Sequence, residues 1–229
     1  MWRAGQERRL DLVRRWSASQ TKGRVLENGC GVGEYLARLG QEATLAVGMD
    51  IEFPRLEEAK KKNRNLVCAA GEALPFKRNL FDLVLSNEVI EHVQYDRMAI
   101  AECTGVLTNG GRLVLFCPNR GYPFETHGIF VKGKYRFGNK FLINYLPKKW
   151  RDRLAPHVRA YSRKDLTRLF SGLPVRIVFQ TIIFGGYDNI IQRLPFLGKL
   201  IRSKLQFLEK TPLKFFGLSH FWVVEKKRA

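Results

Sequence analysis

Short apolar runs alternate with helical segments along the first half of the chain, and this alternation constrains the fold more than any other feature. The run FDLVL at 81–85 is apolar throughout, apart from one aspartate, which is typical of a strand buried on both faces of a sheet. Because successive parallel strands need a crossover between them, the pattern predicts parallel strands joined by helices. Strands are expected at 24–27, 44–49, 66–69, 81–85 and 112–117, and helices near 6–18, 35–39, 54–62 and 96–107.

The second half of the chain adds two strands and interrupts the alternation once. Runs at 175–183 and 221–224 have the composition of strands, which brings the expected total to seven. Residues 121–161 show no β–α repeat and are expected to form an aromatic and basic insertion after the fifth strand, covering the ligand edge of the sheet. The sequence therefore predicts a single α/β domain over 1–229, built on a Rossmann-like, doubly wound, mostly parallel sheet.

A glycine-rich turn, ENGCGVG, follows the first strand at 27–33. In an open parallel sheet, ligands bind beside this turn, outside the carboxyl ends of the strands. The turn departs from a dinucleotide fingerprint, because Glu34 follows Gly33 and the strand ends in Glu27. A pyrophosphate beside two carboxylates would be repelled, whereas an ammonium or a sulfonium would be favoured. Asp50, which is 17 residues after Gly33, can accept both hydroxyls of a ribose, so the turn predicts a site for a cationic nucleoside.

Four motifs in order resemble those of the class I S-adenosylmethionine (SAM)-dependent methyltransferases, specifically the branch called methyltransferase type 11. They are ENGCGVG, VGMDIE, AAGEALPF at 69–76 and FDLVLSNEVIEHV at 81–93, and the resemblance covers residues 22–120. It implies SAM as cofactor. The residues that it places around the methionine moiety are Glu27, Gly29, Gly31 and Gly33, with Asp50 on the ribose. Those that it places near the adenine are Ile51, Ala73 and Glu72, and the floor towards the acceptor would be formed by Asn87, Glu88 and Val89.

The cysteine pattern predicts neither a disulfide nor a metal site. Cys30, Cys68, Cys103 and Cys117 lie far apart, without a CxxC pair or a paired Cys/His spacing of the kind that zinc sites use. We therefore expect reduced, buried thiols and no metal. The chain also has no apolar run of about 18–20 residues and no N-terminal stretch of signal-peptide length. These features predict a cytoplasmic protein.

A methyl group on a sulfonium is already electrophilic, so a methyltransferase mainly has to align the acceptor with the methyl carbon and exclude water. A hydroxyl acceptor would also benefit from a general base, which is most often a histidine. Candidates lie in or near the insertion, where Glu125 and His127 occur in PFETHG and His157 in APHVRAY. His92, beside Glu91, is a further candidate, although both also fit as helix-start and packing residues. A lone loop histidine is often only a surface or hydrogen-bonding group, so each assignment is a hypothesis.

Positive charge is concentrated in the second half of the chain. The formal net charge is +19, and residues 121–229 carry 22 basic side chains against six acidic ones. Between 121 and 150, eight aromatic residues are interleaved with lysines and arginines, which suits either nucleic acid or the headgroup layer of an anionic membrane. Within 190–210, apolar residues recur at helical spacing and predict a basic amphipathic helix. Such a helix favours peripheral contact with the inner face of a membrane, although a helix packed on the sheet has the same pattern.

Three functions follow from these patterns, and we favour methyl transfer from SAM to a small-molecule acceptor that is hydrophobic or lipid-linked. The resembled branch includes enzymes of quinone and other lipid-linked pathways. An RNA methyltransferase is the alternative that the basic half suggests, but SNEV stands after the fourth strand in place of an N-P-P-Y tetrad. The third is a non-catalytic methyltransferase-like protein that docks to a membrane or a partner, against which the intact glycine turn and Asp50 argue.

Overall fold

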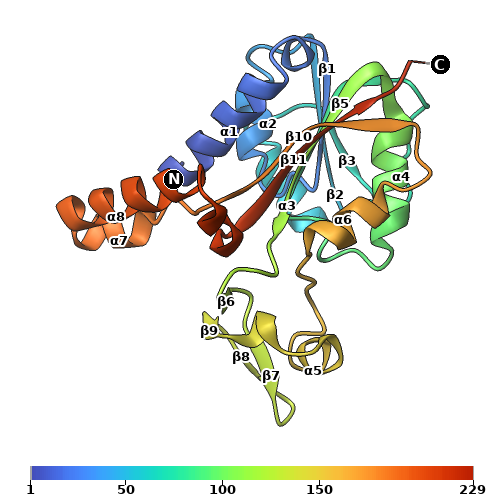
Figure 1. Ribbon diagram of the computed structural model, residues 1–229. Helices are drawn as coiled ribbons and strands as arrows, with labels where there is room; N and C mark the ends of the chain where they lie inside the picture. Colours follow the sequence, from blue (N-terminus) through green and yellow to red (C-terminus); the bar gives the residue numbers. More distant parts are fainter. Residues whose placement is uncertain (1, 229) are drawn as a thin grey trace.

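A seven-stranded sheet forms the centre of the computed structural model, which describes residues 2–228 (Figure 1). Its strands are β1 Arg24–Asn28, β2 Leu45–Asp50, β3 Leu66–Cys68, β4 Phe81–Asn87, β5 Leu107–Pro118, β10 Val175–Ile183 and β11 Ser219–Lys226. They lie in the order β3-β2-β1-β4-β5-β11-β10. β11 runs antiparallel to both of its neighbours, and the other neighbouring strands pair in parallel. The predicted Rossmann-like, mostly parallel sheet is therefore confirmed.

Helices cover both faces of this sheet, as the doubly wound pattern predicts. They are α1 Ala4–Trp16, α2 Glu34–Leu39, α3 Phe53–Ala59, α4 Asp96–Val106 and α6 Arg163–Leu169, with a 3-10 turn, η1, at Gln20–Lys22. On one face, Leu10 of α1 and Leu39 of α2 share an apolar core with Leu83 of β4. On the other face, Ile100 of α4 packs in a second core with Trp222 of β11. Each fully buried leucine contributes about 1.5–3 kcal/mol, so both layers hold the strand ends in fixed positions.

The fifth strand begins earlier than the sequence pattern predicts. β5 starts at Leu107, so the NGG sequence at 109–111 lies within a strand and not in a loop. The pairing of β4 with β5 shifts in register between Phe81 and Leu83. Gly110 takes a φ of +80°, which glycine adopts without steric cost, and it lies in the stretch between the Phe81–Leu107 and Leu83–Arg112 pairs.

The insertion forms a small lobe at the carboxyl ends of the strands (Figure 1, green to yellow). Its elements are β6 Phe124–Glu125, β7 Ile129–Val131, β8 Lys134–Arg136, β9 Lys140–Phe141, the 3-10 turn η2 Ile143–Tyr145 and α5 Lys148–Leu154. β6 pairs with β9 and β7 with β8, and Ile129, Ala155 and Val158 form a core of their own. The lobe leaves and rejoins the sheet at one point, because Asn119 pairs with Tyr161 just beyond β5. It is therefore placed over the edge where ligands bind.

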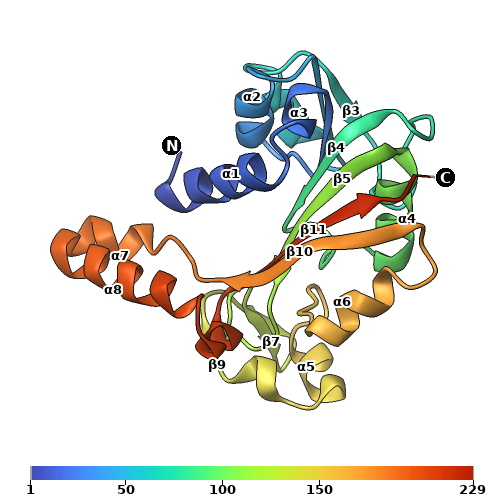
Figure 2. The same ribbon diagram turned by 45° about the horizontal axis from the view of Figure 1, so that its top comes forward.

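The predicted amphipathic segment at 190–210 is two helices, α7 Asp188–Arg193 and α8 Pro195–Leu208. Pro195 opens the second helix, since its ring can begin a helix but cannot continue one. The two helices pack closely at Gly198, where a Cβ would lie 2.7 Å from the Ile191 Cα. Figure 2 shows the pair extending away from the sheet, followed by the 3-10 turn η3 Pro212–Phe216. Within residues 2–228, no helix combines the length and the apolar character needed to cross a bilayer.

The expectation that all cysteines are buried is wrong for one of them. Cys30, Cys103 and Cys117 are buried, whereas Cys68 is exposed. Cys68 is the last residue of β3, which is an edge strand of the sheet and only three residues long. All four thiols are free.

Candidate active site

The glycine turn after β1 rests directly on the end of β2. The amides of Gly29 and Cys30 both donate to the Met49 carbonyl, at 2.7 and 2.9 Å. Gly29 has a φ of +75° and lies against Val89, so a Cβ there would come within 2.3 Å of the valine side chain. At Gly31, with a φ of +52°, the nearest atom to an added Cβ is 3.6 Å away, on Arg55. The turn is thus closed towards β4 and open at Gly31, where a ligand can approach the backbone.

Asp50 ties this turn to the second strand. Its Oδ2 accepts a hydrogen bond from the Gly31 amide at 2.7 Å, and its Oδ1 accepts one from the Glu52 amide at 2.9 Å. A carboxylate oxygen has about two acceptor sites, so each Asp50 oxygen can still accept a hydroxyl. The position and chemistry of Asp50 fit a ribose.

A cavity of about 600 Å³ opens beside the turn and brings together most of the predicted cofactor residues. The predicted residues on its wall are Gly29, Asp50, Ile51, Glu72, Ala73, Glu88, Val89 and His92. Sequence reasoning did not identify Arg55, Tyr95 and Met98, which also line it. These three residues belong to none of the sequence motifs. They line the cavity because α3 and α4 begin at this edge of the sheet.

Four of the predicted cofactor residues do not line this cavity. Gly31 lies next to it, since its amide donates to Asp50, which is on the cavity wall. Gly33 faces α3, since a Cβ on it would lie 2.3 Å from Asn63 Nδ2. Asn87 accepts a hydrogen bond from Arg9 Nη1 at 2.5 Å on the other side of β4. Glu27 lies beneath the turn, and its Oε2 has no hydrogen-bond partner among residues 2–228. Burial raises the pKa of Glu27 to about 8.

Glu72 lies on the cavity wall, but its carboxylate also caps a neighbouring segment. Its Oε1 accepts hydrogen bonds from the amides of Gln94 and Tyr95, at 2.7 and 3.2 Å. This contact holds the start of α4 against the cavity. Only Oε2 is left to accept a hydrogen bond from an adenine amino group. Glu72 would therefore have two roles, the adenine contact that the resemblance implies and the capping of the segment before α4.

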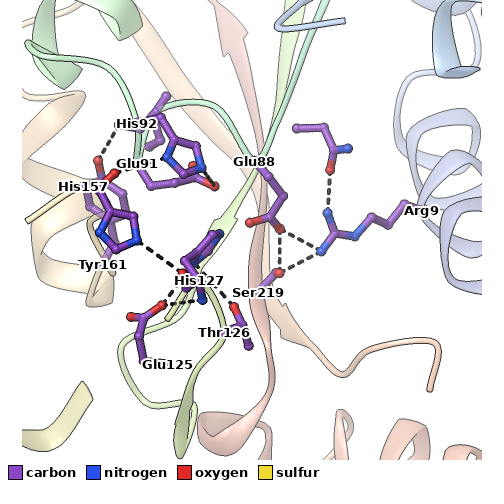
Figure 3. A network of polar contacts seen from close by, with 12 residues as sticks. Arg9, Glu88, Glu91, His92, Glu125, Thr126, His127, His157, Tyr161 and Ser219 are labelled. Carbon is purple, nitrogen blue, oxygen red and sulfur yellow. Dashed lines mark hydrogen bonds and ion pairs between the residues drawn. The ribbon is translucent and has the colours of Figure 1, made fainter. Parts of the chain in front are cut away.

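Glu88 is held by residues that are distant in the sequence. Its Oε1 accepts hydrogen bonds from Arg9 Nη2 and Ser219 Oγ, both at 2.8 Å (Figure 3). Burial opposes ionisation of Glu88, but the Arg9 guanidinium outweighs it and lowers the pKa of the carboxyl. Glu88 also has a φ of +57°, a strained conformation for a residue with a Cβ, and such strain is found preferentially at functional sites. No local signal predicts this contact, because α1, β4 and β11 meet only in the folded sheet.

The four predicted catalytic residues lie together between the segment after β4 and the insertion (Figure 3). Glu125 Oε1 is 3.1 Å from His127 Nδ1, and Glu125 Oε2 accepts a hydrogen bond from Arg151 Nη2 at 2.8 Å. His157 Nε2 is 3.3 Å from the His127 carbonyl oxygen, and His92 Nδ1 is 3.3 Å from the His157 carbonyl oxygen. The rings of His92 and His127 are 5.3 Å apart. His92 links this cluster to the cavity, since it belongs to both.

Burial and neighbouring polar groups together set the ionisation of this cluster. Burial lowers the pKa of His92, so this imidazole is neutral at pH 7. Glu125 is also penalised by burial, but hydrogen bonds from His127 and the charge of Arg151 outweigh the penalty and lower its pKa. Arg151 is 2% exposed, and an arginine so buried needs its carboxylate partner. The sequence reasoning did not identify Arg151 as the residue that fixes Glu125.

A family model described as "Methyltransferase domain" matches residues 26–115. The ubiquinone biosynthesis O-methyltransferase of Coxiella burnetii is 28% identical over 134 residues, which are 56% of this chain and 54% of that protein. The malonyl-[acyl-carrier protein] O-methyltransferase of Legionella pneumophila is 37% identical over 99 residues, which are 40% of this chain and 34% of that protein. The chain thus spans about half the length of the curated relatives it matches, or less.

The fold is shared with a SAM-dependent methyltransferase from Mesorhizobium loti, at a TM-score of 0.63 and 16% identity over 95% of this chain and 100% of that one. The family match begins in β1 and ends in β5, so it contains the glycine turn, Asp50 and the segment after β4. Residues 26–115 thus form a methyltransferase domain similar to those of the class I SAM-dependent methyltransferases of the type 11 branch, whose cofactor is SAM.

Proposed function

We propose that this protein transfers a methyl group from SAM to a small-molecule acceptor that is hydrophobic or lipid-linked. The observation that carries the proposal is the position of His92, which lies both on the wall of the cofactor cavity and in the polar cluster of the insertion. An acceptor between the two would have the cofactor on one side and groups able to remove a proton, or to stabilise an oxyanion, on the other.

The residues of the cavity and of the glycine turn beside it fit SAM. Gly31 leaves room for close approach of a ligand, and Asp50 has free acceptor sites for ribose hydroxyls. The buried Glu27 carboxyl, which has an oxygen without a partner in the described chain, would be stabilised in its ionised form by a nearby cation. When bound, SAM supplies an electrophilic methyl group. Ile51 and Ala73 would then flank the adenine, as the resemblance implies.

The insertion supports an apolar acceptor. Phe130 and Tyr135 lie beside His157, each with its ring centre 5.6 Å from the imidazole. Aromatic rings next to a polar cluster can pack an apolar body while a polar group of the acceptor reaches the histidines. The Coxiella relative is named for ubiquinone biosynthesis and the Legionella relative for an acyl carrier protein substrate, which is consistent with an acceptor of this class.

A paired labelling assay tests the acceptor class. The purified protein is incubated with methyl-labelled SAM and either an organic extract of cells or total RNA. We expect label in the organic extract, and none with a Gly31→Arg variant as control. Incorporation into RNA alone would make RNA methylation the function. SAM binding without label in either fraction would support the non-catalytic alternative.

We also propose that α8 places the protein on an anionic membrane. Phe196 is 84% exposed and Phe207 is 64% exposed, on a helix that also carries Lys199 and Arg202. A basic helix with exposed aromatic side chains suits the headgroup boundary, where each basic group adds about 1 kcal/mol at an anionic surface. Sedimentation with anionic vesicles but not with neutral ones, reversed by salt, is the expected result, and equal binding to both would contradict the proposal.

A further inference from the structure

Glu91, His92 and His127 converge in the polar cluster from two different parts of the chain (Figure 3). Glu91 and His92 follow β4, whereas His127 lies between β6 and β7 of the insertion. Each offers one metal-ligating atom, and these atoms all lie within 4.8 Å of one another. His92 Nε2 is 3.9 Å from Glu91 Oε1. The lack of paired spacing in the sequence concealed this group, since 35 residues separate His92 from His127.

Glu91 is a buried acid without a cationic partner from Lys or Arg in the described residues. It is 1% exposed, and neither of its carboxylate oxygens has a hydrogen-bond partner within residues 2–228. A buried carboxyl without partners costs free energy, and buried charges in proteins are normally paired or bound to a metal. The nearby Glu88 is an anion paired with Arg9, so it opposes a negative charge on Glu91 and cannot stabilise the ionised carboxylate. A cation beside Glu91 would remove this cost.

The two histidines are oriented as metal ligands are. A ligating histidine usually donates its second ring N–H to a carboxylate or a backbone carbonyl, which fixes the tautomer. His127 Nδ1 contacts Glu125 Oε1, and His92 Nδ1 contacts the His157 carbonyl oxygen. Both contacts place the proton on Nδ1 and leave the lone pair of Nε2 for a metal. Glu125 is in turn fixed by Arg151, so this outer layer is rigid.

We propose that Glu91, His92 and His127 bind one divalent transition metal ion, of which Zn²⁺ is the best match. Two imidazoles and one carboxylate form a ligand set that catalytic zinc sites use, with a fourth position left open. Mg²⁺ and Ca²⁺ prefer sets made of oxygen ligands. Tetrahedral bonds of about 2.0 Å bring ligand atoms to roughly 3.3 Å from one another, so binding draws the three side chains closer than they now lie. His92, which is half exposed, is free to make this adjustment.

The metal gives the proposed methyl transfer a way to activate a hydroxyl acceptor, and this part of the inference rests on the proposed function. His92 also lines the cofactor cavity, so the open position adjoins the acceptor space. Bound Zn²⁺ would lower the pKa of an acceptor hydroxyl, so that its proton could pass to water near neutral pH. The acceptor oxygen could then take the methyl group from SAM, with formation of a C–O bond, cleavage of the C–S bond and release of S-adenosylhomocysteine.

Metal binding is measured first, without any assay of activity. Protein treated with a chelator is titrated with Zn²⁺ by calorimetry and with Co²⁺ by visible absorption. We expect one equivalent per chain and Co²⁺ bands typical of a four- or five-coordinate site. Glu91→Gln and His127→Asn should lose stoichiometric binding, and Glu125→Gln, which removes an outer-layer carboxylate charge, should weaken it about 10–100-fold. Cys68→Ser removes the exposed thiol and should leave binding unchanged.

Two outcomes overturn the proposal. One is the absence of stoichiometric binding in the unaltered protein. The other is equal binding in Glu91→Gln and His127→Asn, provided that circular dichroism shows both variants to be folded. Calorimetric SAM binding and methyl transfer are then compared with and without the chelator. Transfer that persists in metal-free protein would refute the role of the metal in activating the acceptor and leave the proposed function intact. Metal binding without transfer to any extract would refute the proposed function and leave the site.

Discussion

The Asp50 carboxylate accepts a hydrogen bond from the Gly31 amide at 2.7 Å, so the residue that ends β2 also sets the shape of the turn after β1. One side chain therefore serves two parts of the cofactor site. It positions the backbone that approaches the ligand, and it keeps acceptor sites for ribose hydroxyls.

Changing either partner of this hydrogen bond should abolish SAM binding. Gly31→Arg forces a residue with a Cβ into a φ of +52° and fills the open side of the turn, and Asp50→Ala removes the ribose acceptor and frees the turn. We expect micromolar binding by calorimetry in the unaltered protein and no measurable heat in either variant. Glu57→Gln, on the exposed face of α3, is the control and should bind normally. Unchanged heats in both site variants would remove the assignment.

SAM binding should release a proton at neutral pH. Burial raises the pKa of Glu27 to about 8, so its carboxyl is mostly protonated at pH 7 in the ligand-free protein. A cationic ligand favours the ionised form and lowers this pKa, so affinity should rise with pH and level off above pH 8. Calorimetry in phosphate and in Tris, which differ in ionisation enthalpy, measures the protons released. In Glu27→Gln the release should disappear, and its persistence there would assign it to another group.

The same carboxyl should make folding weaker as pH rises. The pKa of Glu27 is about 8 in the folded protein and near 4.5 in the unfolded chain. Between these values the folded state holds the extra proton, so the contribution of Glu27 to the free energy of unfolding falls with rising pH and is lowest above pH 8. Urea unfolding at pH 6 and pH 8.5 checks this. Glu27→Gln should show a smaller loss of stability across this range than the unaltered protein.

Removing Arg151 should loosen the insertion and not the sheet. Arg151→Leu leaves Glu125 buried without its cation, which costs about 3–5 kcal/mol. Because the lobe has its own core around Ile129, Ala155 and Val158, we expect faster hydrogen exchange within 119–161 and unchanged protection in β1 and β4. The double variant Arg151→Leu, Glu125→Leu removes both charges and should recover most of the protection. Equal loss in the sheet would show that the lobe does not fold as a separate unit.

Membrane binding should depend on both the exposed aromatic side chains and the basic side chains of α8. Phe196→Ser with Phe207→Ser removes apolar surface that the fold leaves exposed, so binding to anionic vesicles should fall while the melting temperature stays the same. Lys199→Glu with Arg202→Glu should reduce binding in low salt and have little effect in high salt. Full binding by both double variants would place the membrane contact elsewhere.

Much of the fold follows from local patterns. β10 matches its predicted bounds, and the other strands of the sheet lie where apolar runs and turn residues indicate. The boundary of β5 was less predictable, because Leu107 pairs with Phe81 ahead of the glycine turn residues and so extends the strand across Gly110. The single helix expected within 190–210 is divided in two before Pro195. The spacing of the apolar residues did not predict this break, because it takes no account of proline.

The cofactor site could be inferred in part for the same reason. Gly29 and Gly31 follow β1 and Asp50 ends β2, and a parallel sheet must bring these strand ends to one edge, so their order in the sequence predicts their proximity. Gly33 and Asn87 share these motifs but face other elements, because successive residues of a turn or strand point in different directions.

The sequence alone therefore determined the strand order along the chain, the glycine turn and the acid that ends β2, since each depends on neighbouring residues. Only the tertiary structure decided that His127 lies beside Glu91 and His92, and that Arg9 and Ser219 hold Glu88. These contacts join segments with no shared pattern. The histidine contacts form because the insertion folds around its own small core and the Arg151–Glu125 pair. The Glu88 contacts form because an apolar core holds α1 against β4 and β11.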